Sequence, residues 1–453
     1  MKQIPILILV AASIAVSTSC NKYLDVEPKG KVILSNVSDY DLFLNGQTLT
    51  SSGARELNLL ADDVDMPATP LPPTTQENMV YYWATQFTTD EKLPPVFWGK
   101  HYSNIYRYNA VLNGIDLAGN GTATDKKRIK AEALLGRAFE YFYLINLYAK
   151  PYNATTAAKD LGVPFITTTD ISQETPPRST VADIYKHILD DITAAIPDLP
   201  TGNAANRYRG SVPAAYSVLA RIYYYMDKMT DAAAAASKAL GTMPPALLDY
   251  NTIASKSGIP SMALRPFELY ARYSTNSSMR EYPTIEMLKT FDVNDLRLLY
   301  LYGGLGDLSF KKRGDAYFNP NGTPANFGTS VEEMKLIIAE EAALRSDVDA
   351  ALTQINDIRK CRIKKAVYQP LATTDKDIAL GWVLRERKFE LAYRGLRWFD
   401  MRKLNAAGKM PLLRRMGAND QVLVELPPNS PKYVLQIPVS VLYFNPDMPR
   451  NEE

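Results

Sequence analysis

Residues 213–244, PAAYSVLARIYYYMDKMTDAAAAASKALGTMP, decide the fold, because they have the spacing of two consecutive helices. One face of the first helix carries Tyr216, Leu219, Ala220 and Tyr223. The second helix is lined by Ala232, Ala236 and Ala239 and ends at Pro244. Small residues at the contact let two antiparallel helices approach closely, and the large ones fill the space around them. The stretch therefore predicts a helical hairpin.

This order of large, small and closing proline residues resembles the tetratricopeptide repeat, a helix–turn–helix unit of roughly 34 residues. One such unit cannot bury its own apolar face, so neighbouring units are expected. A second unit follows Ser330-x-x-Glu333, which is typical of a capping box at a helix start. Its small residues Ala339 and Ala351 lie twelve positions apart, as Ala220 and Ala232 do. The spacing predicts a repeated helical scaffold.

Apolar periodicity and capping residues predict the remaining elements. Further helices are expected at Ser38–Gly46, from Trp98 past Leu112, from Thr124 or Asp125 to Tyr148, from Thr180 to Pro197, at Tyr282–Phe291 and from Thr374 to about Leu404. Short strands are expected around Leu264–Tyr273 and Leu298–Tyr302. Residues 61–97 and 245–329 show no sustained period and read as two long irregular regions. Loops of that length usually have a function.

The first twenty residues are typical of a secretory signal. Lys2 precedes an apolar run that is too short for a comfortable membrane-spanning helix, and small residues lead to Cys20. A cysteine in this place looks like a bacterial lipobox, in which cleavage leaves an acylated Cys20 as the first residue. The usual leucine three places earlier is Ser17 here, so a plain signal with an incidental cysteine is the alternative. Several acyl chains would make a stable anchor.

Charge and composition exclude several classes of protein. The 453-residue chain carries a formal charge of +2, which gives no reason to expect nucleic acid as a partner. Cys361 is the one cysteine besides Cys20, so neither a disulfide framework nor a cysteine-rich metal site is expected. The 28 tyrosines are many, and they suggest amphipathic rings at the surface.

No sequence motif indicates catalysis, a metal or a cofactor. Asp62, Asp63 and Asp65 resemble the start of a calcium loop, but the following positions lack its ligand and glycine, so turn chemistry is the preferred interpretation. Glu386 and Glu390 stand one helical turn apart. Four neighbouring arginines favour ionised acids in an ion-pair lattice, which is the wrong state for a general acid. Neither His101 nor His187 lies near a nucleophile motif. We therefore expect no catalytic residues, no metal site and no cofactor.

Several motifs in a fixed order now point to a known family. They are CNKYLDVEP at 20–28, ADDV at 61–64, the Trp98 to Asn109 pattern, ALLGRAFEYFYLINLYAKPY at 133–152, RERKFELAYRGLRWFDMRKL at 385–404 and IPVSVLYFNPDM at 437–448. Together they resemble the SusD/RagB family of outer-membrane nutrient-binding lipoproteins of Bacteroidetes. Arg394 departs from the pattern, since many members carry an acidic residue before the glycine.

The resemblance implies a mainly α fold in which four tetratricopeptide-like helix pairs pack against a loop-rich half with a few short strands. It implies a signal peptide at 1–19 and one SusD-like domain at 20–453, with the scaffold at 98–244 and 330–405 and the ligand half at 61–97 and 245–329. It also implies a role at the cell surface. Such proteins capture a glycan, oligosaccharide or peptide and pass it to a partner SusC-type TonB-dependent transporter.

Sugar binding requires flat aromatic faces and polar groups for the hydroxyls. The irregular regions offer Tyr81, Tyr82, Trp83, Phe87, Tyr270, Tyr273, Tyr300, Tyr302, Tyr317 and Phe318. Trp83 ranks first, as the one tryptophan outside a predicted helix, although each ring could instead pack its own loop. A secreted glycosidase and a helical scaffold that binds no small ligand remain as alternatives to the nutrient-binding lipoprotein.

Overall fold

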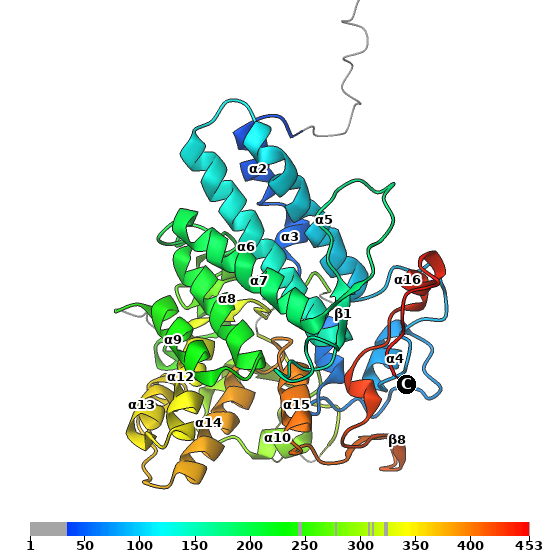
Figure 1. Ribbon diagram of the computed structural model, residues 1–453. Coiled ribbons are helices and arrows are strands. Elements are labelled where there is room, and N and C mark those ends of the chain that lie inside the picture. Colours follow the sequence, from blue (N-terminus) through cyan, green and yellow to red (C-terminus); the bar gives the residue numbers. More distant parts are fainter. Residues whose placement is uncertain are drawn as a thin grey trace, which may run out of the picture.

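Helices dominate the computed structural model, which describes residues 34–242, 247–276, 279–306, 309, 312–320 and 325–452 (Figure 1). The helices of the N-terminal half are α2 (Val37–Phe43), α3 (Gln47–Thr50), α4 (Gln76–Tyr81), α5 (Trp98–Gly114), α6 (Ala123–Tyr148), α7 (Val181–Ala195), α8 (Val212–Tyr225) and α9 (Met229–Leu240). Those of the C-terminal half are α10 (Ile285–Lys289), α11 (Leu296–Leu301), α12 (Val331–Leu344), α13 (Val348–Lys360), α14 (Lys376–Glu390), α15 (Arg397–Ala406) and α16 (Val439–Phe444). The predicted mainly α fold is confirmed.

The two hairpins predicted from the repeated spacing are both present. Helix α8 packs against α9, and α12 packs against α13. The four small residues of the matched repeats, Ala220, Ala232, Ala339 and Ala351, are fully buried. Helix α9 also packs against α12, which joins the two hairpins into one continuous layer although 90 residues of chain separate them (Figure 1). Helices α5, α6 and α7 extend the layer, since α6 packs against both neighbours.

Side-chain caps set the helix starts. Thr180 and Ser330 accept hydrogen bonds from the backbone N–H groups of Asp183 and Glu333, as their sequence patterns predicted. The prediction for α6 was two residues late, because Thr122 rather than Thr124 or Asp125 is its N-cap. The predicted end of α9 at Pro244 and the predicted signal and Cys20 lie outside the described residues.

Three predicted elements differ in the structure. The expected helix from Thr374 to Leu404 is two helices, α14 and α15, because Tyr393 and Gly395 adopt positive φ angles of 58° and 75° that no helix accommodates. The strand expected at Leu298–Tyr302 is mostly helix α11. Residues 61–97 include the helix α4, so this region is less irregular than predicted.

The described strands are short and pair in antiparallel twos. They are β1 (Leu161–Pro164) with β2 (Arg178–Thr180), β3 (Glu268–Tyr270) with β6 (Thr329–Ser330), β4 (Tyr302–Gly303) with β5 (Tyr317–Phe318), and β7 (Leu413–Met416) with β8 (Val422–Leu426). Three of the pairs join segments that are close in sequence, whereas α10, α11, β4 and β5 lie between β3 and β6. No described strand pair forms a sheet large enough to carry a core of its own.

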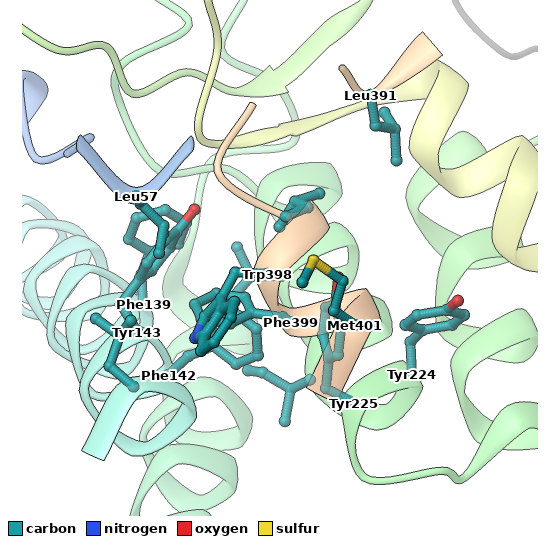
Figure 2. Close-up of a cluster of buried hydrophobic side chains, with 14 of the residues drawn as sticks. Leu57, Phe139, Phe142, Tyr143, Tyr224, Tyr225, Leu391, Trp398, Phe399 and Met401 are labelled. Carbon is teal, nitrogen blue, oxygen red and sulfur yellow. The ribbon is translucent and has the colours of Figure 1, made fainter. Parts of the chain in front are cut away.

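One cluster of buried side chains in the extensive hydrophobic core lies where α15 meets α6 and α8 (Figure 2). Trp398 and Phe399 of α15 are buried, as predicted. The Phe399 ring meets Phe142 and Tyr225 edge-on, with centroids 5.8 Å apart in both pairs. Helices α6, α8 and α15 are thus locked together by aromatic contacts.

The buried side chain of Arg221 ties two helices of the layer to each other and to the chain before β6. The guanidinium of Arg221, on α8, donates to both carboxylate oxygens of Glu333, on α12, at 2.7 and 2.6 Å. It also donates to the backbone carbonyls of Phe327 and Gly328, which precede β6.

Within the described residues, no helix is both long and apolar enough to cross a membrane.

Candidate functional site

A pocket of about 260 Å³ opens in the loop-rich half. Its lining comes from five separate segments and consists of Arg55, Ser274, Asn276, Met279, Arg280, Glu281, Tyr317, Phe318, Asn319, Pro320, Ala325, Phe327 and Tyr393. The volume is just below the range of about 300–1,000 Å³ that is typical of small-molecule sites. Room for one sugar ring or a short side chain is therefore available.

Tyr317 supplies the pocket with a half-buried aromatic ring. It lies on β5 directly opposite Gly303 of β4. A Cβ atom at Gly303 would lie 2.7 Å from the Tyr317 ring, so the glycine makes the space that this ring occupies. The guanidinium carbon of the exposed Arg280 lies 4.6 Å from the centroid of the Tyr317 ring. The guanidinium lies over this ring, so the exposed Arg280 side chain has to turn aside before a ligand can stack on that face, and it then remains beside the ligand as a donor.

The opposite part of the lining is polar and rigid. Arg55 donates to both carboxylate oxygens of the buried Glu281, at 2.8 and 2.5 Å. The Nδ2 group of Asn58 also donates to Glu281, at 2.8 Å. Arg55 donates in addition to the backbone carbonyl of Asn276. These bonds hold the Glu281 carboxylate in place with its charge compensated.

Asn58 connects this pocket to the turn between α14 and α15. Its side chain donates to the carbonyl of Tyr393 at 3.0 Å and accepts from the N–H of Gly395 at 2.9 Å. Tyr393 itself lines the pocket, where its ring lies 4.7 Å from that of Phe318. The positive φ angles that end α14 therefore direct part of the 385–404 signature into the pocket wall.

Most aromatic residues that the sequence nominated for ligand contact are buried. They are Tyr81, Tyr82, Trp83, Tyr270, Tyr300, Tyr302 and Phe318, each less than a tenth exposed. The polar tips of several bond within the protein, as Tyr82 does to the carbonyl of Thr69 and Tyr300 to that of Ile253. These rings pack within the protein, several of them against distant segments, as Tyr270 does against Phe139 of α6.

Trp83, the first choice from sequence, is the clearest correction. Only 2% of it is exposed, and its Nε1 donates to the carbonyl of Leu60 at 2.9 Å. The guanidinium of Arg415 covers its ring at 4.0 Å from the centroid. Its position outside a helix was predicted correctly, since it follows α4 with a positive φ of 50°. A loop position does not imply exposure when another segment covers the loop.

Three of the nominated rings are half-buried, namely Phe87, Tyr273 and Tyr317. Phe87 borders a void of about 20 Å³, which is too small for a sugar. Tyr273 packs against Tyr208 with centroids 5.7 Å apart. Tyr317 is the member of this set that lines the 260 Å³ pocket, together with the nominated but buried Phe318.

Sequence reasoning missed Arg55, Arg280 and Glu281. No local pattern marks them, because Arg55 and Glu281 are 226 positions apart and meet only in the folded chain. An arginine followed by a glutamate, as at Arg280 and Glu281, is also common in exposed loops and does not mark a binding site. The tertiary structure alone identifies one as a pocket donor and the other as a compensated acid.

The three aspartates that resembled a calcium loop differ in their contacts. Asp62 pairs with Arg397, and Asp65 pairs with Arg313. Asp63 is buried, and neither of its carboxylate oxygens has a hydrogen-bond partner. Among the described residues, no three His, Cys, Asp or Glu side chains are grouped to hold a metal ion.

Glu386 and Glu390 do lie in an ion-pair lattice, but their partners come from other segments and not from the four neighbouring arginines that the sequence suggested. Arg297 donates to both of them at 3.0 Å, and Arg362 donates to Glu390 at 2.6 Å. Burial favours a raised pKa of Glu390, but Arg362 and Arg297 outweigh it and lower that pKa to about 2. Both acids lie within the core rather than at a cleft.

The two histidines are also structural in this geometry. Nδ1 of the buried His101 lies 2.6 Å from a carboxylate oxygen of Glu140. The ring of His187 stacks on Phe165 with centroids 3.9 Å apart. Neither faces the 260 Å³ pocket.

Comparisons with known proteins agree with this architecture. One protein-family model, described as starch-binding associating with outer membrane, matches residues 22–224, and another, described as the SusD family, matches residues 333–453. A SusD-like protein of Bacteroides ovatus is 23% identical over 232 residues, which make up 48% of this chain and 38% of that protein. The match thus spans well under half the length of this curated relative.

Solved structures show the same fold over nearly the whole chain. A SusD superfamily protein from Bacteroides thetaiotaomicron has a TM-score of 0.73 at 20% identity, and the match covers 92% of this chain and 100% of that one. A SusD-like carbohydrate binding protein from Bacteroides vulgatus has a TM-score of 0.67 at 19% identity, with coverage of 91% and 97%. Both family models and these structures therefore lead to one assignment: the chain belongs to the SusD/RagB family.

Proposed function

We propose that the protein is a nutrient-binding lipoprotein of the outer membrane, and that it binds a glycan in the pocket formed around Tyr317. The observation that carries this proposal is the pairing of the half-buried Tyr317 ring with the guanidinium of Arg280 at the pocket mouth. An aromatic face suits the apolar face of a sugar ring, and the guanidinium suits its hydroxyl groups. The helical layer supplies rigid support.

The names of the relatives support a carbohydrate rather than a peptide. One matching family model is described as starch-binding, and one structural neighbour as a carbohydrate binding protein. We extend to this chain the family's partnership with a SusC-type TonB-dependent transporter, which would receive the captured glycan. Acylation of Cys20 would hold the protein at the membrane surface facing the cell exterior. The aromatic contacts in this proposal are reduced from the sequence-derived set to Tyr317.

A glycosidase is the less favoured alternative. Hydrolysis of a glycosidic bond usually requires two carboxyl groups on either side of the bond. Of the described residues that line the pocket, Glu281 is the one that carries a carboxylate, and Arg55 holds it in a bidentate ion pair. Incubation of the protein with any glycan that it binds, followed by product analysis, separates binding from hydrolysis.

Titration calorimetry with soluble plant and host oligosaccharides tests the binding proposal. Loss of one stacking ring face costs about 1 kcal/mol, so Tyr317→Ala should raise Kd about fivefold. Tyr106→Ala is the matched control, since this exposed tyrosine on α5 lies away from the pocket and should leave Kd unchanged. Equal effects of the two substitutions would place the ligand elsewhere, and binding of no oligosaccharide would favour the scaffold alternative.

Membrane attachment has its own test. Cys20→Ala should release the mature protein from the membrane fraction of cells that lack the transporter. Retention of the variant in that fraction would contradict lipid anchoring at Cys20. Purification of the transporter under mild detergent, with detection of this protein in the complex, tests the partnership independently.

A further inference from the structure

A second and larger cleft lies on another part of the molecule. It has a volume of about 810 Å³ and is lined by residues of α10, α14, α15 and the β7–β8 hairpin. These elements lie in the lower part of Figure 1. None of the nominated glycan residues lines it except the buried Tyr81. Six cationic and four carboxylate side chains form its wall, which leaves a surplus of positive charge.

Most of the acids in this wall are already paired. Asp62 accepts two hydrogen bonds from Arg397, at 2.7 and 2.6 Å. Arg313 bridges Asp65 and Asp420, at 2.5 and 2.7 Å. The remaining carboxylate, Glu286, is exposed in the first turn of α10.

Two cations on α14 are less fully paired than the other cations of the wall. Arg385 makes no ion pair or hydrogen bond with the described part of the chain, and its Nε is buried without a partner. Lys388 is one helical turn further along the same face, and its nearest carboxylate oxygen, on Asp62, is 3.6 Å away. Lys388 forms a loose ion pair with Asp62, whose carboxylate also accepts two hydrogen bonds from Arg397. Arg385, which has no partner among the described residues, and Lys388, which shares its partner with Arg397, can therefore both contact an anionic group that enters the cleft.

A third cation in the wall strengthens this field. Arg415 is buried, and its guanidinium bonds to backbone carbonyls, including those of Leu59 and Val64, rather than to a carboxylate. Burial lowers the pKa of Arg415, while the nearby carboxylates act in the opposite direction. Arg415 therefore adds to the positive field of the wall without contacting a ligand directly.

The apolar part of the cleft indicates the kind of ligand. Its two aromatic rings are occupied, since Phe389 stacks on Phe291 at 3.9 Å and Arg415 covers Tyr81 at 4.3 Å. No free ring face is therefore presented to a sugar by these residues. The more accessible apolar groups are the aliphatic side chain of Leu384 and the thioether of Met416. The flexible methionine side chain can adapt its shape to the apolar side chains of a peptide.

We propose that this cleft binds an acidic peptide segment of a partner protein, with Arg385 and Lys388 contacting its carboxylates and Leu384 contacting an apolar side chain. The volume accommodates a few residues of such a segment. Charge complementarity would direct the segment to this face rather than to the smaller glycan pocket. The proposal does not depend on glycan binding.

Fluorescence anisotropy with the full mature chain tests the proposal. The probe is a labelled peptide of alternating glutamate and leucine. Arg385→Ala/Lys388→Ala should weaken its binding about tenfold or more. Lys364→Ala/Lys365→Ala is the matched control, because it removes two exposed cations outside the cleft, and it should change Kd by less than about twofold. Thermal unfolding of both double variants verifies that they are folded.

Two further measurements separate the peptide from other anions. Leu384→Ser should weaken the peptide several-fold and leave the overall charge unchanged, because it removes the apolar contact. An oligogalacturonate of equal charge should compete poorly. Absence of peptide binding, equal effects of the two double variants, no effect of Leu384→Ser, or tighter binding of the oligogalacturonate than of the peptide would each overturn the proposal.

Discussion

Asp63→Asn should make the protein more stable at neutral pH than it is with the native residue. Asp63 is buried, and its carboxylate oxygens have no hydrogen-bond partner. Burial, with the charge of Asp62 beside it, raises the pKa of Asp63 to about 6, although Lys388 and Arg397 act in the opposite direction. Burial and the charge of Asp63 in turn raise the pKa of Tyr302 and the pKa of Tyr393.

The size of the effect follows from the shift in pKa. The ordinary value is 3.8, so the folded state holds the Asp63 proton by about two pKa units more tightly than the unfolded chain. Two units correspond to about 3 kcal/mol. Because the folded pKa is the higher one, this stability is present in acid, declines as the pH rises from about 4 to 6, and is absent above about pH 7. The asparagine variant has no such loss.

Urea unfolding from about pH 4.5 to 8 measures this directly. The difference in unfolding free energy between Asp63→Asn and the native protein should grow by about 2 kcal/mol across that interval, in favour of the variant. Asp62→Asn is the control with the opposite sign. Burial of Asp62 is outweighed by Arg397, its pKa is lowered, and its loss should destabilise the protein at neutral pH. A difference for Asp63→Asn that stays constant with pH would refute the reasoning.

Three other substitutions test the packing that surrounds the proposed sites. Trp83→Ala should lower the free energy of unfolding by about 3–5 kcal/mol, because it empties a core position. An unchanged melting temperature would show that Trp83 is not a core residue and would again make it a candidate for ligand contact. Arg221→Ala should cost about 3–5 kcal/mol in denaturant unfolding, because it leaves the buried Glu333 carboxylate unpaired, whereas Arg414→Ala breaks an exposed pair and should cost under about 1 kcal/mol. Gly303→Ala should weaken glycan binding, since its methyl group displaces the Tyr317 ring, and calorimetry that finds native affinity would contradict this.

Local patterns in the chain were enough to predict the helical scaffold. The twelve-residue spacing of Ala220 and Ala232, repeated at Ala339 and Ala351, predicted two hairpins that the structure contains. Capping patterns at Thr180 and Ser330 marked the starts of α7 and α12. These features are predictable because helix periodicity and capping depend on residues within about one turn of each other.

The break between α14 and α15 was not predictable in this way. Gly395 adopts a φ of 75°, and a Cβ there would lie 2.6 Å from the ring of Phe327. The amide of Asn58 holds the turn from a segment more than 330 positions away. A contact over that distance in sequence has no local signature.

The sequence by itself determined the helical repeats and the family, because both depend on short-range spacing and on motifs in a fixed order. The tertiary structure alone decided which aromatic rings remain accessible. Trp83 and Tyr317 are both aromatic residues outside helices, but Arg415 arrives from β7 to cover the first, while Gly303 leaves room for the second beside Arg280. Exposure is a property of what other segments pack against a residue, and only the folded chain brings those segments together.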